Sequence, residues 1–187
     1  MKKIVFTIAL GLGLLTANAQ IQELSGPRIG VTFISSGTAA DFVHEGISSL
    51  DNEANQIGKT GSATITQYGW QWESRFADGG ADVTGIVEWI ALVGGMEQGL
   101  FLPSVSSIIG VRVANGLEVG AGPNLSLTGV GMIFAIGHNF KSGSLNLPVN
   151  LVFMPGKSTV GTANDGKDYT YNSGLRISLM VGFNLSK

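Results

Sequence analysis

The sequence predicts an all-β protein, an antiparallel up-and-down transmembrane β-barrel of eight strands that follows a signal peptide. Three observations predict it. Only 13% of the 187 residues are charged, about half of the ~25% that is usual in soluble globular domains. Apolar residues recur at every second position through most of the chain, which is the period of a β-strand. All four arginines fall inside such segments, on the face opposite the aliphatic residues, whereas every lysine lies elsewhere.

The composition excludes several classes of protein. A hydrophobic content of 44% and a mean hydropathy of +0.29 are too high for a disordered chain. The absence of cysteine excludes a disulfide scaffold and a thiolate metal site. A net charge of -2 provides no basic surface for nucleic acid, and the length fits one domain. Glycine accounts for 28 of the 187 residues, about twice its usual share of about 7%. This abundance needs a structural reason.

Residues 1–19 indicate a secretory signal peptide. Two lysines open the segment, an apolar run follows from Ile4 to Leu15, and small residues end it at Ala17-Asn18-Ala19. The apolar run is too short for a membrane-spanning helix, and the Ala-x-Ala pattern is typical of a cleavage site. A buried N-terminal helix is the alternative, but it leaves the lysines and the small residues unexplained. We therefore expect residues 20–187 to form the outer-membrane β-barrel domain.

Eight segments of the exported chain alternate apolar and polar residues, and only residues 35–63 form a long interruption. The expected strands are residues 27–34, 64–76, 83–93, 104–113, 117–127, 130–140, 145–154 and 172–185. Their lengths approximate the roughly 9 to 11 residues that a tilted strand needs to cross a bilayer.

The first three strands differ in how clearly their faces separate. The first carries Arg28 opposite its aliphatic residues. The second has the clearest alternation, with Tyr68, Trp70, Trp72 and Phe76 on one face and Gln67, Gln71, Glu73 and Arg75 on the other. The third is apolar on both faces, because Ile86 and Ile90 share the parity of Glu88.

The longest uncharged stretch, residues 119–140, would look like a transmembrane helix to a hydropathy window. Its five glycines and Pro123 disfavour a helix. From Val130 onward the apolar residues fall at every second position, so we predict strands instead. Pro123 and Pro148 each remove a hydrogen bond from the middle of a strand, which predicts a bulge at each.

Three short turns test whether one register fits neighbouring strands, because opposed residues of a hairpin share a face. We predict two-residue turns at Thr128-Gly129 and Ser142-Gly143, and a three-residue turn at Ala114-Asn115-Gly116. The predicted pairs are Leu127 with Val130, Ser126 with Gly131, Phe140 with Leu145, Asn139 with Asn146, Val113 with Leu117, and Arg112 with Glu118. All of them keep apolar with apolar and polar with polar residues.

The charges within the strands share one face. A soluble sandwich would point such charges at water and use lysine freely, whereas a membrane barrel turns its charges inward and its apolar band toward lipid. We predict a lumen charge network of Arg28, Glu73, Arg75, Glu88, Arg112, Glu118 and Arg176. Arginine suits this role because its planar fork can bind two carboxylate oxygens. The predicted lipid-facing aromatic residues are Tyr68, Trp70, Trp72, Trp89, Phe134, Phe153 and Phe183.

The abundance of glycine fits a narrow barrel. Eight strands leave an interior just wide enough for side chains. We therefore expect inward glycines to make room beside the large charged residues, at Gly30, Gly110, Gly120, Gly122, Gly131, Gly137 and Gly182.

With its signal peptide, eight alternating segments, inward Arg and Glu residues, and short turns such as Ala114-Asn115-Gly116 and Lys141-Ser142-Gly143-Ser144, the chain resembles the small outer-membrane β-barrels of the OmpA/OmpX type, within the porin-like barrel superfamily. The resemblance covers nearly all of residues 25–187 and is one of pattern. It implies a monomer in the outer membrane of a Gram-negative bacterium, in contact with outer-membrane lipids and lipopolysaccharide and assembled by the barrel assembly machinery. Members commonly end in an aromatic residue, whereas here the nearest aromatic residue is Phe183.

If the N-terminus lies on the periplasmic side, the connections at 35–63, 94–103, 128–129 and 155–171 face outward. In the first of them, Thr38-Ala39-Ala40-Asp41 matches a capping box, and the apolar residues that follow it have helical spacing, at Val43, Ile47 and Leu50. We expect a short helix over the barrel mouth, either as a lid packed on the barrel or as part of a surface binding site.

The sequence predicts a structural or surface-binding role, with no catalysis, no cofactor, no metal and no nucleic-acid partner. His44 beside Glu45 indicates a solvated surface pair. The segment Asn164-Asp165-Gly166-Lys167-Asp168 spaces its oxygen atoms like a calcium loop but lacks the later bidentate glutamate.

Two alternatives stay open at this stage. The first is a lipid-modifying barrel enzyme. Some outer-membrane barrels deacylate lipid A with a histidine and a nearby serine, and His138 has the outward parity for this, although Phe140 follows it on that face. The second is a soluble barrel of the lipocalin type that binds an apolar ligand. That alternative inverts the faces, so that Trp70 and Phe134 point inward and the arginines point to water.

Overall fold

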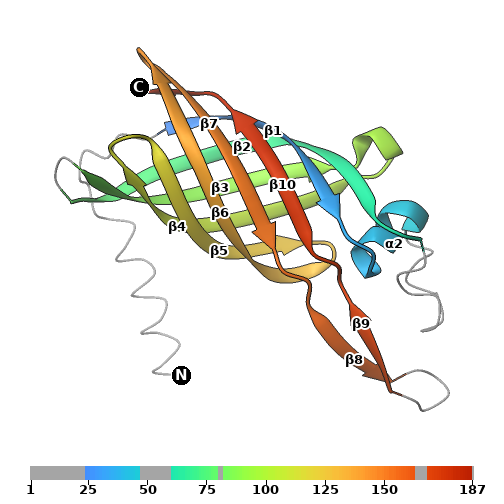
Figure 1. The fold of residues 1–187 in the computed structure, drawn as a ribbon. Helices are drawn as coiled ribbons and strands as arrows, with labels where there is room; N and C mark the ends of the chain where they lie inside the picture. The colour runs from blue at the N-terminus through green and yellow to red at the C-terminus, as the bar shows by residue number, and fades with distance from the viewer. Residues whose placement is uncertain (1–23, 47–59, 80–81, 163–167, 187) are drawn as a thin grey trace, which may run out of the picture.

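The structure is a computed structural model that describes residues 24–46, 60–79, 82–162 and 168–186 (Figure 1). The predicted signal peptide lies outside these residues. The described residues form a closed antiparallel β-barrel of eight strands, which confirms the predicted all-β class and the predicted number of strands. No helix among them is long and apolar enough to cross a membrane.

The elements follow the predicted segments closely. In chain order they are β1 (Leu24–Ile34), α2 (Thr38–Glu45), β2 (Ala63–Asp78), β3 (Val83–Gly94), η4 (Met96–Gln98), β4 (Leu102–Val113), β5 (Leu117–Ser126), β6 (Gly129–Ser142), β7 (Leu145–Met154), β8 (Ser158–Thr162), β9 (Asp168–Asn172), β10 (Arg176–Gly182) and β11 (Asn184–Ser186).

The barrel closes through β1, which pairs with β2 on one side and with β10 and β11 on the other. Arg28 lies opposite Gly182 of β10, and Ser25 lies opposite Leu185 of β11. These pairs belong to one continuous register, so β10 and β11 together form the eighth strand. That strand begins at Arg176, and the prediction that it begins at residue 172 is wrong.

Residues 168–172 belong instead to β9, which pairs only with β8 in a separate two-stranded sheet. This hairpin projects beyond the barrel end that also carries α2 and η4 (Figure 1). The predicted outward connection 155–171 therefore contains strands of its own. The alternation of Val160 and its neighbours was too short to separate a hairpin from a loop.

The turn at Ala114-Asn115-Gly116 has the predicted register. Arg112 lies opposite Glu118, and Gly116 takes a φ of 93°, a left-handed conformation that suits glycine. The backbone N–H of Gly116 donates to the carbonyl oxygen of Val113 at 2.8 Å. This turn thus places the two charged side chains on the same face.

The two predicted two-residue turns are each displaced by one residue. The observed turns are Leu127-Thr128 and Gly143-Ser144, so the predicted pairs are wrong by two positions. The observed pairs are Leu125 with Val130, Ser126 with Gly129, Asn124 with Gly131, Phe140 with Leu147, and Asn139 with Pro148. Gly143 has a φ of 62°, which suits the first turn position of a hairpin. A shift of two positions leaves every side chain on its predicted face.

The prolines do not produce the predicted bulges. The register is the same on both sides of Pro123 and of Pro148. At Pro123 the pairing of β4 with β5 skips two positions and then resumes, because proline has no N–H to donate. The register shift that does occur lies in β2, between Arg75 and Ala77.

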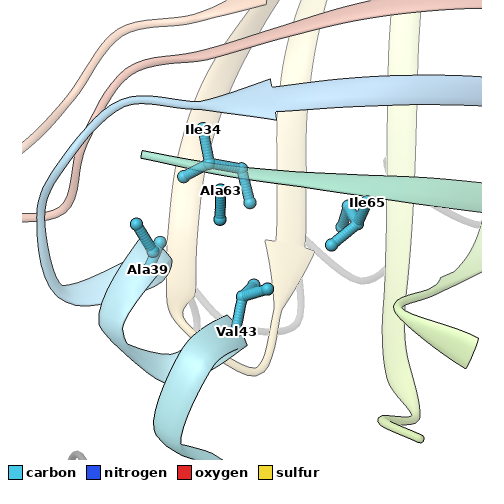
Figure 2. Packing of buried hydrophobic residues seen from close by; sticks show 6 residues of the cluster. Ile34, Ala39, Val43, Ala63 and Ile65 are labelled. Atoms are coloured by element: carbon cyan, nitrogen blue, oxygen red, sulfur yellow. The ribbon is translucent and has the colours of Figure 1, made fainter. Parts of the chain in front are cut away.

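Helix α2 packs on the barrel end through its apolar face (Figure 2). Its side chains join a buried cluster of Ile34, Ala39, Ala40, Val43, Ala63 and Ile65. The predicted capping box is wrong, because the N-cap residue is Gly37 and no side chain caps the helix. The predicted continuation through Ile47 and Leu50 lies outside the described residues. The described helix therefore has the geometry of a lid packed on its own barrel.

Beside this lid, η4 is held to β2 by Glu97. Thr66 donates its backbone N–H to Glu97 Oε1 at 2.7 Å and its hydroxyl to Oε2 at 2.5 Å. Slight desolvation raises the pKa of Glu97, but these hydrogen bonds favour the carboxylate and lower the pKa overall. A lowered pKa in the folded state means that this contact stabilises the fold above the unfolded pKa and loses its effect as the pH falls through the folded one.

We therefore expect carboxyl ¹³C NMR titration of the folded protein to give Glu97 a pKa below that of an unstructured glutamate. Thr66→Val removes one of the two hydrogen bonds and should move the pKa back toward the ordinary value. Identical titration curves for the two proteins would contradict the assignment of this contact.

Candidate functional site

The candidate site is the polar interior of the barrel. Five of the predicted network residues are buried there, on five adjacent strands from β1 to β5: Arg28, Glu73, Glu88, Arg112 and Glu118. The strand alternation carries each of them to the inner face, while their sequence neighbours face outward. The site therefore depends on the alternation of side chains along each strand and on the pairing register between neighbouring strands.

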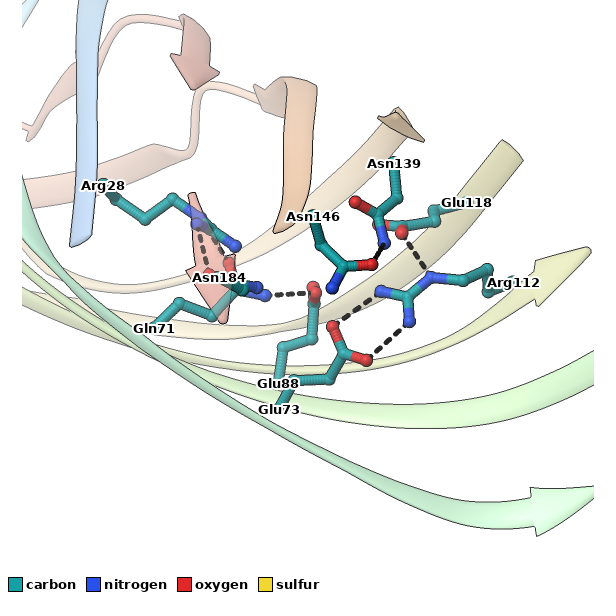
Figure 3. Close-up of polar contacts among 9 residues, drawn as sticks. All are labelled: Arg28, Gln71, Glu73, Glu88, Arg112, Glu118, Asn139, Asn146 and Asn184. Carbon is teal, nitrogen blue, oxygen red and sulfur yellow. Dashed lines mark hydrogen bonds and ion pairs between the residues drawn. The ribbon is translucent and has the colours of Figure 1, made fainter. Parts of the chain in front are cut away.

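Arg112 joins two carboxylates (Figure 3). Its Nη1 and Nη2 donate to the two Glu73 oxygens, each at 2.6 Å, and its Nε donates to Glu118 Oε1 at 2.5 Å. Glu118 is the direct ladder partner of Arg112, whereas Glu73 reaches it from β2, with β3 lying between. All three residues are at most 9% exposed. Charge-assisted, bidentate contacts of this kind are the strong class of protein hydrogen bonds.

Arg28 has no carboxylate among its hydrogen-bond acceptors in the described structure. Its Nε donates to Gln71 Oε1 at 2.6 Å, and its Nη1 donates to Asn184 Oδ1 at 3.0 Å. Gln71 in turn donates its Nε2 to Glu88 Oε1 at 2.5 Å. The amide of Gln71 thus links Arg28 to Glu88 (Figure 3).

The other two predicted network residues lie apart from these contacts. Arg75 is half-buried, and its Nε has no hydrogen-bond partner among the described residues. Arg176 donates its Nη2 to the hydroxyl of Thr128 at 2.5 Å, in the mouth of the barrel. The structure therefore brings together five of the seven residues and leaves Arg75 and Arg176 outside that group.

Sequence reasoning missed the amide side chains that complete the interior. Besides Gln71 and Asn184, they include Asn139, whose Nδ2 donates to Asn146 Oδ1 at 3.3 Å. All four are buried. The alternation places Gln71 on the inner face of its strand, but it does not show which partners an inward amide bonds to.

The interior also contains a cavity of about 120 Å³ between the charged residues and α2. Aliphatic residues such as Ile65 and Ile90 line it, together with Arg28, Gln71 and Glu88. The part of the lumen below α2 is thus narrow, and its floor is made of the hydrogen-bonded network.

Gly182 makes room for Arg28, as predicted for this glycine. A Cβ atom at Gly182 would lie 2.0 Å from Arg28 Nη1 and 2.5 Å from the carbonyl oxygen of Pro27. Other inward glycines face different neighbours, because Gly30 lies against Met180 and Gly131 against Met154. For Gly110, Gly120, Gly122 and Gly137 the nearest atoms likewise belong to the backbone or to uncharged side chains, so the prediction that these glycines adjoin charged residues is confirmed only for Gly182.

We expect Gly182→Ala to lower the free energy of unfolding by about 1–3 kcal/mol, the usual range for overpacking an interior. The Arg28 side chain could move away, but the Pro27 carbonyl belongs to the backbone and cannot yield as easily. Denaturant unfolding of the two proteins measures the difference. An unchanged transition midpoint would show that the interior has free space at this position.

The outer face of the barrel is apolar and exposed. The seven aromatic residues predicted to face outward are each between 42% and 53% exposed: Tyr68, Trp70, Trp72, Trp89, Phe134, Phe153 and Phe183. Aliphatic residues continue this surface around the barrel. The inverted faces of the lipocalin-type alternative are wrong, because Trp70 points outward and Arg28 is only 3% exposed.

The two histidines of the chain lie on different elements, His44 on α2 and His138 on β6. The His138 ring lies beside the Phe140 ring, with centroids 4.4 Å apart and planes tilted by 39°, and its Nδ1 has no hydrogen-bond partner among the described residues. His44 Nε2 lies 3.1 Å from the carbonyl oxygen of Ser62. No group of three or more potential metal ligands occurs in the described part of the chain. Residues 164–167 of the calcium-like segment lie outside it.

Comparison of the chain with protein-family models, with curated proteins and with solved structures finds no match.

Proposed function

We propose that this chain is an integral outer-membrane β-barrel with a lumen filled by side chains, acting in a structural or surface-binding role without catalysis. The observation that carries the proposal is the distribution of polarity in the barrel. The charged strand residues Arg112 and Glu73 are buried in the lumen, whereas Trp72 and Trp89, directly paired on neighbouring strands, are each about half exposed on the outside. This is the polarity of a barrel in lipid.

The outward aliphatic residues form a continuous row, which supports a lipid contact. Direct ladder pairs link Val31 to Leu179, Leu179 to Leu151, Leu151 to Ile136, Ile136 to Val119, and Val119 to Val111. Each of these six side chains is between 40% and 54% exposed. Soluble monomers rarely expose contiguous apolar patches larger than a few hundred Å², so a surface of this kind needs an apolar environment.

The two ends of the barrel differ in a way that supports an orientation. One end has short turns, at Ala114-Asn115-Gly116 and at Gly143-Ser144, and the other has α2, η4 and the β8–β9 hairpin. Outer-membrane barrels have short periplasmic turns and longer extracellular loops. We place α2 and the hairpin on the outer surface, beside lipopolysaccharide, and propose a monomer that the barrel assembly machinery inserts.

Cell fractionation after export tests the membrane proposal. We expect the chain in the outer-membrane fraction, with heat-dependent migration on a detergent gel because a folded barrel resists unfolding in detergent. Recovery from the aqueous periplasmic fraction would contradict the proposal. A planar bilayer tests the filled lumen separately, since large and stable single-channel currents would show an open pore.

A further inference from the structure

A second pocket lies at the barrel end that carries α2 and the hairpin. Its volume is about 400 Å³, which is within the size range of small-molecule sites. We call it the mouth pocket and define it by Thr38, Asp41, Thr128, Lys157, Tyr171 and Arg176. These residues come from α2, the β5–β6 turn, the β7–β8 connection, β9 and β10, so five parts of the chain converge on it.

The charges of the mouth pocket favour an anion. Lys157 and Arg176 line it, and within the described residues neither forms an ion pair with a carboxylate. Arg176 uses Nη2 on Thr128, while its Nε has no partner among these residues. The carboxylate in the pocket, Asp41, already accepts a hydrogen bond from the Thr60 hydroxyl at 2.5 Å. Two cationic side chains thus line the pocket, and each has N–H donors that are not used within the described residues.

The backbone around these cations is fixed by hydrogen bonds. Lys157 donates its N–H to Ser173 Oγ at 2.8 Å, and Ser173 returns its N–H to the Lys157 carbonyl oxygen at 3.0 Å. Leu175 donates its N–H to Ser35 Oγ at 2.9 Å, which ties the segment between β9 and β10 to the connection between β1 and α2. A pocket whose backbone is already held in place loses less conformational entropy when a ligand binds.

The remaining lining groups indicate the kind of molecule to which the anionic group is attached. Thr38, Thr128, Thr159 and Ser173 supply hydroxyls, and Tyr171 supplies a half-buried aromatic ring with a polar tip. Hydroxyl groups can donate and accept hydrogen bonds, and an aromatic face offers an apolar surface to the C–H groups of a sugar ring. A purely apolar ligand would use none of these polar groups.

We propose that the mouth pocket binds a phosphorylated sugar, with its phosphate between Lys157 and Arg176 and its ring against Tyr171. The inference goes beyond the proposed function and does not rest on it, because the pocket exists whether or not the barrel wall contacts lipid. The same chemistry occurs in free sugar phosphates and in the phosphorylated glucosamine headgroup of lipid A, and the experiment below distinguishes the two.

Isothermal titration calorimetry of the full folded barrel in uncharged detergent micelles tests the proposal, with glucose 6-phosphate as the probe. We expect saturable binding, weaker binding of glucose and of inorganic phosphate, and loss of affinity with added salt. Lys157→Gln and Arg176→Gln should each weaken binding about tenfold or more, the effect of losing one charge-assisted hydrogen bond. Lys141→Gln is the matched control, because this exposed lysine lies at the opposite end, and it should not change the affinity.

Two results would overturn the proposal. One is the absence of saturable binding of glucose 6-phosphate to the unmodified barrel. The other is binding that Lys157→Gln leaves unchanged, a result that a folding defect cannot explain because a variant that still binds is folded. Repeating the titration in lipid nanodiscs with and without lipid A identifies the source. Competition by lipid A supports a headgroup in the pocket, and undiminished binding supports a soluble sugar phosphate.

Discussion

Arg112→Met is expected to lower the free energy of unfolding by about 3–5 kcal/mol, the usual loss when one partner of a buried ion pair is removed. The substitution leaves Glu73 and Glu118 buried without the cation that binds three of their oxygen atoms. Methionine keeps much of the volume of the arginine stem, so the loss of stability measures the effect of removing the charge. Denaturant unfolding of the barrel, folded in detergent or in lipid vesicles, measures it.

Two further variants show whether the loss of stability comes from the buried charges. Adding Glu73→Gln to Arg112→Met removes one of the orphaned charges and should restore part of the lost stability. Lys141→Met removes a cation from an exposed position and should change the free energy by at most about 0.5 kcal/mol, as most surface substitutions do. If Arg112→Met were as mild as Lys141→Met, the network would not stabilise the barrel.

A double-mutant cycle on Arg112 and Glu118 separates the pair from the rest of the network. Residues in direct contact couple by about 0.5–3 kcal/mol, whereas independent sites add. We expect a coupling within that range, because Arg112 Nε lies 2.5 Å from Glu118 Oε1. Additive effects would mean that the Ala114-Asn115-Gly116 turn sets a different register.

That register was predictable because it is local. Three residues separate the strands, glycine occupies the left-handed position, and both charges then fall opposite each other on one face. The contact of Arg112 with Glu73 was not predictable in this way. It joins β4 to β2 over the inner face of β3, and no hairpin rule fixes distances between strands that do not pair.

The same distinction explains the errors. The exact turn residues depend on which glycine adopts a positive φ, as Gly143 does, and the alternation pattern does not contain that information. The predicted faces remained correct although the turns were displaced, because a shift of one residue in a turn moves each residue's partner on the neighbouring strand by two positions. The sequence therefore predicted which face each charge occupies, while the amide links through Gln71 and the β8–β9 hairpin required the structure.

The outer face offers the sharpest test of the membrane proposal. Ile136 lies near the middle of β6, is 51% exposed, and pairs with Val119 and Leu151 on its two sides. In a bilayer this position lies within the apolar band, where an arginine loses hydration. We expect Ile136→Arg to lower the free energy of unfolding from lipid vesicles by about 2–4 kcal/mol, the cost of arginine near the bilayer midplane.

Val160→Arg is the matched control for this substitution. Val160 is also an aliphatic strand residue and is 65% exposed, but it lies in the β8–β9 hairpin outside the barrel wall. There an arginine remains in water, and the change should stay within about 0.5 kcal/mol. A soluble barrel would tolerate both substitutions equally, since both side chains would already face water. Equal effects would therefore contradict a lipid contact, whereas a large loss at Ile136 alone requires that this face be shielded from water.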